Sequence, residues 1–184
     1  MLDILKVIVL GIVEGITEWL PVSSTGHLIL AGDLLRPGMS EAFMEMFNVV
    51  IQLGAIMAVV VLYFHKLNPF SPRKTQKQKM LTWQMWIKVV IASAPAALIG
   101  LPFNDLLDQI FYKPLPVAVM LIVYGVLFII VENRNVGQRP AVRNISELTI
   151  PMVLLIGVFQ MLALIPGTSR SGATIVGALL IGVS

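Results

Sequence analysis

Apolar segments separated by short polar ones make up most of the sequence. Three of them are long enough to cross a bilayer as helices, which takes about 17–25 residues; they are residues 43–64, 81–102 and 115–131. Two further apolar stretches, 2–35 and 148–183, are each interrupted near the middle by polar residues, proline and glycine. The pattern predicts an all-α, polytopic membrane protein.

Each interrupted stretch is expected to form two short helices joined by a polar turn. The first has arms at 2–20 and 27–35, and the latter is too short to cross a hydrocarbon core. The second has arms at 148–165 and 173–183 around a turn at 166–172. We therefore expect both stretches to be re-entrant helix-loop-helix hairpins, which enter the membrane and leave on the same side.

The distribution of charge in the loops predicts the orientation of the spans. The loop 65–79 has five Lys or Arg residues and no acid, and 132–147 has three Arg against two Glu. The link 103–114 is net negative. Because cytoplasmic loops carry the excess of Lys and Arg, both basic loops are expected to be cytoplasmic and the span 43–64 to begin outside.

The two hairpins resemble each other in sequence. Aligned on their prolines, with one-residue gaps, they read Gly11…Glu14…Pro21…Ser24-Thr25-Gly26 and Gly157…Gln160…Pro166…Ser169-Arg170-Ser171-Gly172. Three spans lie between them, so the second should enter from the opposite side. This predicts an inverted repeat, 1–147 followed by the start of a second copy at 148–184, whose hairpins meet near the membrane midplane. By the same logic three more spans are expected after residue 184.

Composition supports this class and excludes others. The chain is 57% hydrophobic and 12% charged, whereas soluble domains have about 25% charged residues. There is no cysteine, which excludes disulfides, thiolate metal sites and cysteine nucleophiles. The net charge of +3 is small and lies in loops, so nucleic acid is not expected as a partner.

Glu14 and Glu18 are the first candidates for chemistry. They are four residues apart on an expected helix and so share a face. Two close carboxylates at low dielectric cannot both stay ionised without a cation or a shared proton. The functional interpretation is a Mg²⁺-type site completed by substrate phosphate oxygens; the alternative is a structural pair bonded to neighbouring helices.

Hydroxyl groups precede the second arm of each hairpin, as Ser23, Ser24 and Thr25 in one and Ser169 and Ser171 in the other. Each can act as an N-cap, and capping alone is one interpretation. Both caps would also direct helix N-termini at the same cavity, where backbone N–H groups bind phosphate.

Arg170 has a serine on either side, and its planar guanidinium group is suited to binding phosphate oxygens. The alternative for Arg170 is a salt bridge to Glu14 or Glu18. His27 follows Ser24 by three residues and could serve as its base, or as an acid for a leaving oxygen. Asn48 and Gln52 share a helix face and could line the cavity or bond neighbouring helices.

Two long motifs carry a resemblance to a known family. Glu14-Gly-Ile-Thr-Glu18-Trp-Leu-Pro-Val-Ser-Ser-Thr-Gly-His27 and Pro166-Gly-Thr-Ser-Arg170-Ser-Gly-Ala-Thr174 resemble the signatures of bacterial undecaprenyl-diphosphate phosphatase, the bacitracin-resistance family. The resemblance implies hydrolysis of a C55 polyprenyl diphosphate to the monophosphate with a divalent cation (Mg²⁺ or Ca²⁺). It places the enzyme in the inner membrane facing the periplasm, where it recycles the lipid carrier for peptidoglycan synthesis.

The resemblance also assigns roles by position. Glu14 and Glu18 match the acidic, metal-binding motif, Ser24 and His27 the catalytic serine and histidine, and Arg170 the phosphate-binding arginine. The expected substrate-binding residues around them are Ser23, Thr25, Gly26, Ser169, Ser171 and Thr174. The chain resembles roughly the first two-thirds of a member.

Two rival interpretations stay open at this point. Inverted repeats with broken helices and midplane ions also describe secondary transporters, so a carrier of polyprenyl phosphates or an ion-coupled carrier is the alternative function. An inactive fragment that serves only in assembly is another. Membrane lipids are expected partners, and a homodimer is the candidate assembly.

Overall fold

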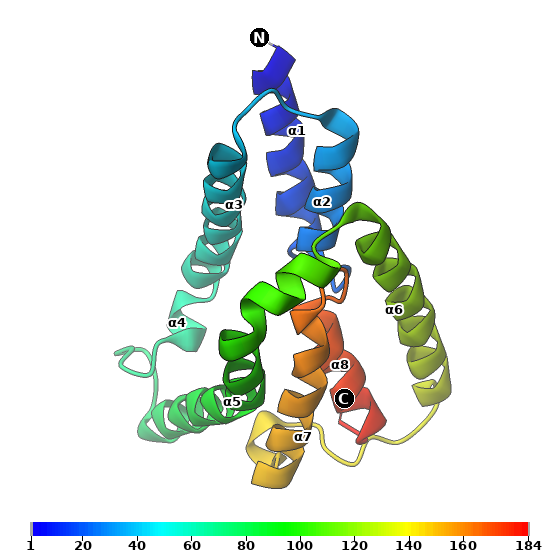
Figure 1. Ribbon diagram of the computed structural model, residues 1–184. Coiled ribbons are helices and arrows are strands. Elements are labelled where there is room, and N and C mark those ends of the chain that lie inside the picture. The colour runs from blue at the N-terminus through cyan, green and yellow to red at the C-terminus, as the bar shows by residue number, and fades with distance from the viewer. Residues whose placement is uncertain (1, 184) are drawn as a thin grey trace.

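The computed structural model describes residues 2–183, and over that range the protein is all-α (Figure 1). The one β-bridge in that range is an isolated parallel pair between Val142 and Val183. The predicted fold class is confirmed. The elements are α1 (Leu2–Thr17), α2 (Ser24–Leu35), α3 (Glu41–Leu62), α4 (Phe64–Leu67), α5 (Gln76–Phe111), α6 (Pro114–Asn135), η1 (Ile145–Glu147), α7 (Ile150–Gln160), η2 (Met161–Leu164) and α8 (Arg170–Leu180).

Three of these helices, α3, α5 and α6, are long and apolar enough to cross a membrane. Helices α5 and α6 contain the predicted spans 81–102 and 115–131, and α3 covers 43–64 except for its last two residues. That these helices cross a membrane stays a prediction. Almost all of their apolar side chains face outward rather than into the protein. A helix satisfies its own backbone hydrogen bonds, so such a surface suits a lipid environment.

The structure corrects the bounds of the second span, which was predicted to end at Pro102. Helix α5 continues through Pro95 and Pro102 to Phe111, and so takes up most of the link predicted at 103–114. An internal proline removes one backbone hydrogen bond and bends a helix without necessarily ending it. Figure 1 shows α5 bent, with its last part running across towards α6. The helix also begins early, at Gln76, because Thr75 and Gln78 form a capping box.

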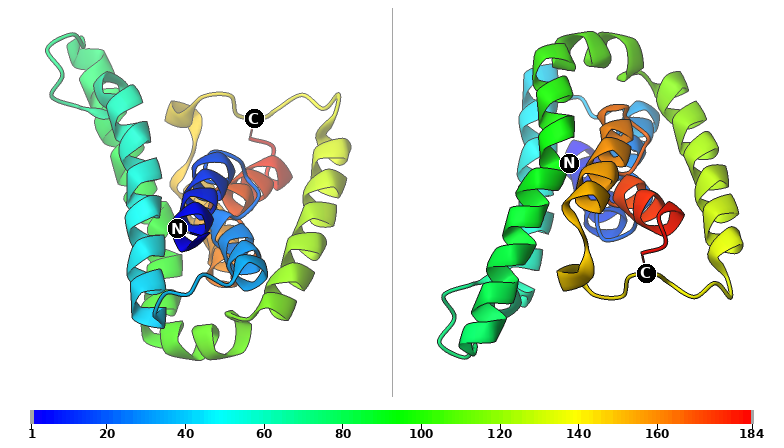
Figure 2. Two further views of the ribbon diagram at one scale, coloured as in Figure 1. Left: turned by 90° about the horizontal axis from the view of Figure 1, so that it is seen from above. Right: turned by 90° about the horizontal axis from the view of Figure 1, so that it is seen from below.

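The two hairpins lie in the middle of the molecule. Figure 1 shows α1–α2 and α7–α8 approaching from opposite ends, with their turns meeting between them. Figure 2 shows both hairpins inside a frame made of α3, α5 and α6. Helix α6 packs on α8 through Tyr124, Val131, Ala173 and Val176, which form a buried apolar cluster. The re-entrant placement of the hairpins in a bilayer, and the inverted repeat, stay predictions.

Helix α7 approaches α5 closely at Gly157. A Cβ atom added there would lie 3.1 Å from Ala92 Cα and would overlap the Ala92 carbonyl oxygen. At Gly11, the counterpart in the first hairpin, an added Cβ would meet nothing within 4 Å. The pair therefore offers a matched test of the contact that positions the second hairpin.

We expect Gly157→Ala to destabilise the protein by about 1–3 kcal/mol, because the methyl group forces two helix backbones apart. Gly11→Ala should be neutral or stabilising by up to about 1 kcal/mol, since alanine is the better helix former. Thermal unfolding in detergent, followed by circular dichroism, measures both. Equal unfolding temperatures for the two variants would show that the contact with Ala92 does not hold α7 in place.

Candidate active site

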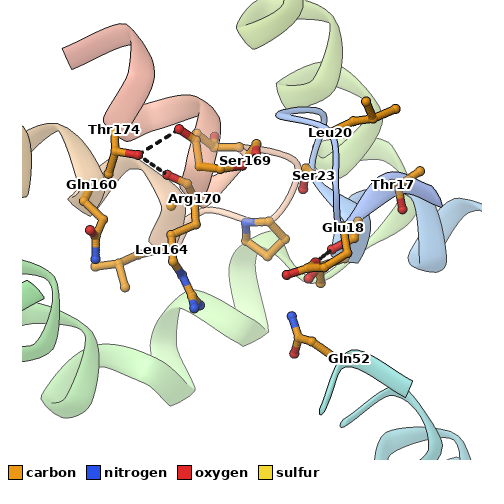
Figure 3. A pocket seen from close by; sticks show the side chains of 16 residues that line it. Thr17, Glu18, Leu20, Ser23, Gln52, Gln160, Leu164, Ser169, Arg170 and Thr174 are labelled. Atoms are coloured by element: carbon orange, nitrogen blue, oxygen red, sulfur yellow. Dashed lines mark hydrogen bonds between the residues drawn. The ribbon is translucent and has the colours of Figure 1, made fainter. Parts of the chain in front are cut away.

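A polar cavity of about 490 Å³ lies where the turns of the two hairpins meet (Figure 3). Its wall combines the end of α1, the start of α2, one residue of α3, and the turn between α7 and α8. The lining residues are Thr17, Glu18, Leu20, Ser23, Ser24, Thr25, Gln52, Gln160, Ala163, Leu164, Pro166, Thr168, Ser169, Arg170, Ser171 and Thr174. Eight residues predicted for the site are among them: Glu18, Ser23, Ser24, Thr25, Ser169, Arg170, Ser171 and Thr174.

The first hairpin supplies a serine and a carboxylate in direct contact. Helix α1 ends at Thr17, so Glu18 begins the turn that leads to Pro21. Ser24 is the first residue of α2, and its hydroxyl donates a hydrogen bond to the Glu18 carboxylate. A carboxylate that accepts a bond from a hydroxyl group is placed to take its proton.

Ser23 caps α2 from an unusual backbone conformation. Its φ of 64° lies in the left-handed region, which costs a non-glycine residue about 1–2 kcal/mol. The backbone N–H of Gly26 donates to Ser23 Oγ (3.3 Å), and Nδ1 of His27 donates to the Ser23 carbonyl (2.8 Å). These bonds hold the turn so that the N-terminus of α2 faces the cavity.

The second hairpin presents another capped helix N-terminus. The backbone N–H of Gly172 donates to Ser169 Oγ (3.2 Å), and the Ser169 and Ser171 hydroxyls are 3.0 Å apart. The Thr174 hydroxyl donates to the Ser171 carbonyl (2.8 Å). Serine is a strong N-cap, and the free N–H groups of a helix N-terminus attract anions.

Arg170 extends from the start of α8 into the open cavity. Figure 3 shows Arg170, Glu18 and Gln52 pointing into one shared space from three different elements. Within residues 2–183 the one ion pair joins Lys6 to Asp3 (3.5 Å), so Arg170 forms no salt bridge with Glu14 or Glu18. The structural alternative for Arg170 is therefore wrong, and its guanidinium is available to a ligand.

The two turns touch through glycine. A Cβ atom added to Gly26 would lie 3.1 Å from Gly167 Cα, and Gly167 itself has a φ of +97°, a conformation that glycine adopts without strain. Gly26 was predicted to bind substrate, but it does not line the cavity. Its place in the structure is this contact between the hairpins.

Glu14 faces a second, adjoining hollow instead of the cavity that Glu18 lines. Thr25 and Gln52 line both spaces, which makes them neighbours. Glu14 is 1% exposed, and neither of its carboxylate oxygens has a hydrogen-bond partner. The two carboxylates therefore line two adjoining spaces, with Glu18 in the turn that follows α1.

The donor set fits a hard divalent cation without forming a closed metal cage. No group of three His, Cys, Asp or Glu side chains within residues 2–183 converges to hold a metal ion. Mg²⁺ is commonly bound by one or two carboxylates, with waters and substrate phosphates completing its shell. A buried carboxylate without partners, such as that of Glu14, requires a cation or a proton in its place.

His27 lies away from the cavity, in an apolar groove of about 480 Å³ beside Tyr124 and Phe128. Its Nδ1 is bonded to the Ser23 carbonyl, while the Ser24 hydroxyl is bonded to Glu18. The predicted pairing of Ser24 with His27 therefore does not form. Sequence spacing suggested it, but on the first turn of α2 the two side chains point to different sides.

The sequence analysis missed some lining residues. Thr17 lines the cavity and donates to the Val13 carbonyl (2.7 Å). The Thr168 hydroxyl is buried without a partner among the described residues. Both are adjacent to residues that were singled out, Glu18 and Ser169, and that adjacency was the available signal. Gln52 was named as a possible lining residue, and the structure places it there.

Comparisons with known proteins identify the relatives of this chain. The family profile described as bacitracin resistance protein BacA matches residues 7–184. An undecaprenyl-diphosphatase of Enterococcus faecalis is 63% identical over 179 residues, which cover 97% of this chain and 65% of that relative. The undecaprenyl-diphosphatase of Acetivibrio thermocellus is 62% identical over all of this chain, and the match covers 68% of that relative. The undecaprenyl-diphosphatase of Lactococcus lactis subsp. lactis is 60% identical over all of this chain, and the match covers 67% of that relative.

The chain thus spans about two thirds of the length of these curated relatives. The residues matched by the family profile include the turns of both hairpins and every residue that lines the cavity. The extent of the family match and the level of identity establish the relationship, and this chain belongs to the bacitracin resistance protein BacA family.

Proposed function

We propose that this chain contains the catalytic site of an undecaprenyl-diphosphate phosphatase, which releases inorganic phosphate and leaves undecaprenyl phosphate. The observation that carries the proposal is the cavity shared by Glu18, Ser24 and Arg170, with two helix N-termini beside it. The names of the relatives supply the substrate class. They give no support to the alternative of a transporter.

The diphosphate would be bound by charge and by backbone donors. The guanidinium of Arg170 offers paired N–H groups to phosphate oxygens, and the N-termini of α2 and α8 add further donors. Ser23, Thr25, Ser169, Ser171 and Thr174 line the remaining wall. Positioning and charge neutralisation provide most of the catalysis in phosphoryl transfer.

Ser24 is the proposed nucleophile and Glu18 its proton acceptor. The Ser24 oxygen attacks the terminal phosphorus, its proton passes to Glu18, and the bond to the bridging oxygen breaks, so undecaprenyl phosphate leaves. Water then attacks the phosphorus of phosphoserine. The bond between that phosphorus and Ser24 Oγ breaks, Glu18 returns its proton to the serine, and phosphate is released as dihydrogen phosphate with both protons of the water.

A divalent cation, Mg²⁺ or Ca²⁺, would be held by Glu14 and Glu18 together with oxygens of the diphosphate. When bound, it supplies positive charge that neutralises the transferred phosphoryl group. The Glu14 carboxylate supports this assignment, because both of its oxygens are buried and have no hydrogen-bond partner.

The proposed location is the inner membrane, with the cavity open to the periplasmic side. The basic loops at 65–79 and 132–147 support this orientation, because they should remain in the cytoplasm. Undecaprenyl phosphate formed on that side would return to carry peptidoglycan precursors, and maintenance of the carrier pool would account for bacitracin resistance in the family.

The test is release of inorganic phosphate from undecaprenyl diphosphate by protein purified in detergent, with Mg²⁺ present. We expect release from the unsubstituted protein and at least a roughly 10²-fold loss in Ser24→Ala. Acid quenching during turnover should trap ³²P on Ser24 when the terminal phosphate is labelled. Ser146→Ala removes an exposed hydroxyl that does not line the cavity, and serves as the control.

Full activity in Ser24→Ala with no trapped phosphoserine would instead assign the attack to water. Substrate movement across proteoliposomes without phosphate release would reject the phosphatase and favour a carrier.

A further inference from the structure

The hollow that adjoins the catalytic cavity is lined by acidic side chains. It has a volume of about 800 Å³ and lies between α1, α2, α3 and the end of α5. Glu41 and Glu45 of α3 and Asp108 of α5 line it and are exposed, whereas Glu14 of α1 lines it from a buried position. No Lys or Arg is among its lining residues.

The carboxylates of this hollow have no cationic partners. Within the described residues the one ion pair is Lys6–Asp3, on the far part of α1 and outside the hollow. Tyr112 also lines the hollow. Burial, and then the negative charges of Asp108 and Glu45, raises the pKa of its hydroxyl above the ordinary value. A cleft lined by one sign of charge raises the local concentration of counter-ions.

Glu14 indicates what such a space would accept. Both of its carboxylate oxygens are buried and without hydrogen-bond partners, and the residue lines the hollow. An uncompensated buried carboxylate is costly, whereas one that binds a cation is not. Thr25 and Gln52 line both the hollow and the catalytic cavity, so an ion beside Glu14 is next to the site of the diphosphate.

We propose that the acidic hollow is the entry path and first binding site for the divalent cation. Glu41, Glu45 and Asp108 attract the hydrated ion, and Glu14 binds it at the boundary with the catalytic cavity. The inference extends the proposed phosphatase function. The same field repels phosphate groups, so the cation and the anionic lipid reach the cavity by different routes.

Direct binding of Mn²⁺ to the purified chain, in detergent and without substrate, tests the proposal. Electron paramagnetic resonance of free Mn²⁺ gives the affinity. The triple variant E41Q/E45Q/D108N removes the charges of the hollow. A matched triple, D33N/D105N/E132Q, removes three exposed acids that do not line it.

At an ionic strength of about 0.01 M we expect the hollow triple to bind Mn²⁺ roughly 5- to 10-fold more weakly than the unsubstituted chain. The matched triple should stay within about twofold, and at about 1 M salt the difference should vanish because charges are screened. Glu14→Gln should remove saturable binding at both salt concentrations.

Equal affinities of the two triples at low salt would overturn the entry path, and unchanged Mn²⁺ binding in Glu14→Gln would overturn the inner site. The unsubstituted chain gives a check that does not depend on the folding of variants, since an affinity insensitive to salt contradicts the proposal. Phosphate release is measured separately. Its absence with the expected Mn²⁺ pattern would reject the phosphatase function alone.

Discussion

Arg170→Ala is expected to lower kcat/KM for undecaprenyl diphosphate hydrolysis by roughly 10³- to 10⁵-fold, the range found when an arginine that stabilises a transferring phosphoryl group is lost. The guanidinium enters the cavity with no carboxylate partner among the described residues. Nothing else in the second hairpin supplies a positive charge there. Phosphate release under single-turnover and steady-state conditions measures the loss.

Arg170→Lys separates charge from geometry. Lysine keeps the charge but lacks the planar fork, so we expect it to recover only part of the activity. Both variants should unfold at the temperature of the unsubstituted protein, because Arg170 is exposed and forms no ion pair. A loss below tenfold, or a clear drop in unfolding temperature, would show that the residue stabilises the fold instead of binding phosphate.

Glu18→Gln should lower kcat by roughly 10²- to 10⁴-fold, the usual effect of losing a general base. Glutamine can still accept a hydrogen bond from the Ser24 hydroxyl, which Glu18 accepts in the structure, but it cannot take its proton. The substitution leaves the shape of the cavity unchanged. Single-turnover phosphate release, with quantification of phosphoserine at Ser24, measures the chemical step.

Glu132→Gln is the control for Glu18→Gln, because Glu132 is an exposed acid at the end of α6, away from the cavity. Rising pH should not restore Glu18→Gln, since an amide does not titrate in this range. Activity within tenfold of the unsubstituted protein would assign the proton of Ser24 to another acceptor, and His27 would be the next candidate to test.

The parts of the fold that depend on hydrophobicity could be predicted from the sequence. Spans are long apolar segments, and α3, α5 and α6 stand where the hydropathy pattern put them. The end of α5 could not be predicted, because proline is compatible with both a bend and a stop. Its continuation to Phe111 depends on packing that the local sequence does not contain.

The membership of the site was more predictable than its pairings. The turn of the first hairpin carries hydroxyl groups, and the turn of the second carries further hydroxyl groups and Arg170. Because the two turns meet, all of these groups line one cavity. The partner of Ser24 was predicted to be His27 on the basis of spacing along a helix. The structure pairs Ser24 with Glu18 across the turn, and the course of a turn depends on backbone angles, such as the left-handed Ser23, that spacing does not reveal.

The glycine contact between the turns, Gly26 against Gly167, has an implication for how this site can change. An added Cβ at Gly26 would lie 3.1 Å from Gly167 Cα, so the turns that carry Glu18 and Arg170 approach each other here without a side chain on either glycine. Residues on the cavity wall can therefore be exchanged during evolution, or by design for other prenyl phosphates, without altering the alignment of the two reactive halves. A bulkier residue at Gly26 or Gly167 would instead push the two turns of this chain apart, whatever the substrate.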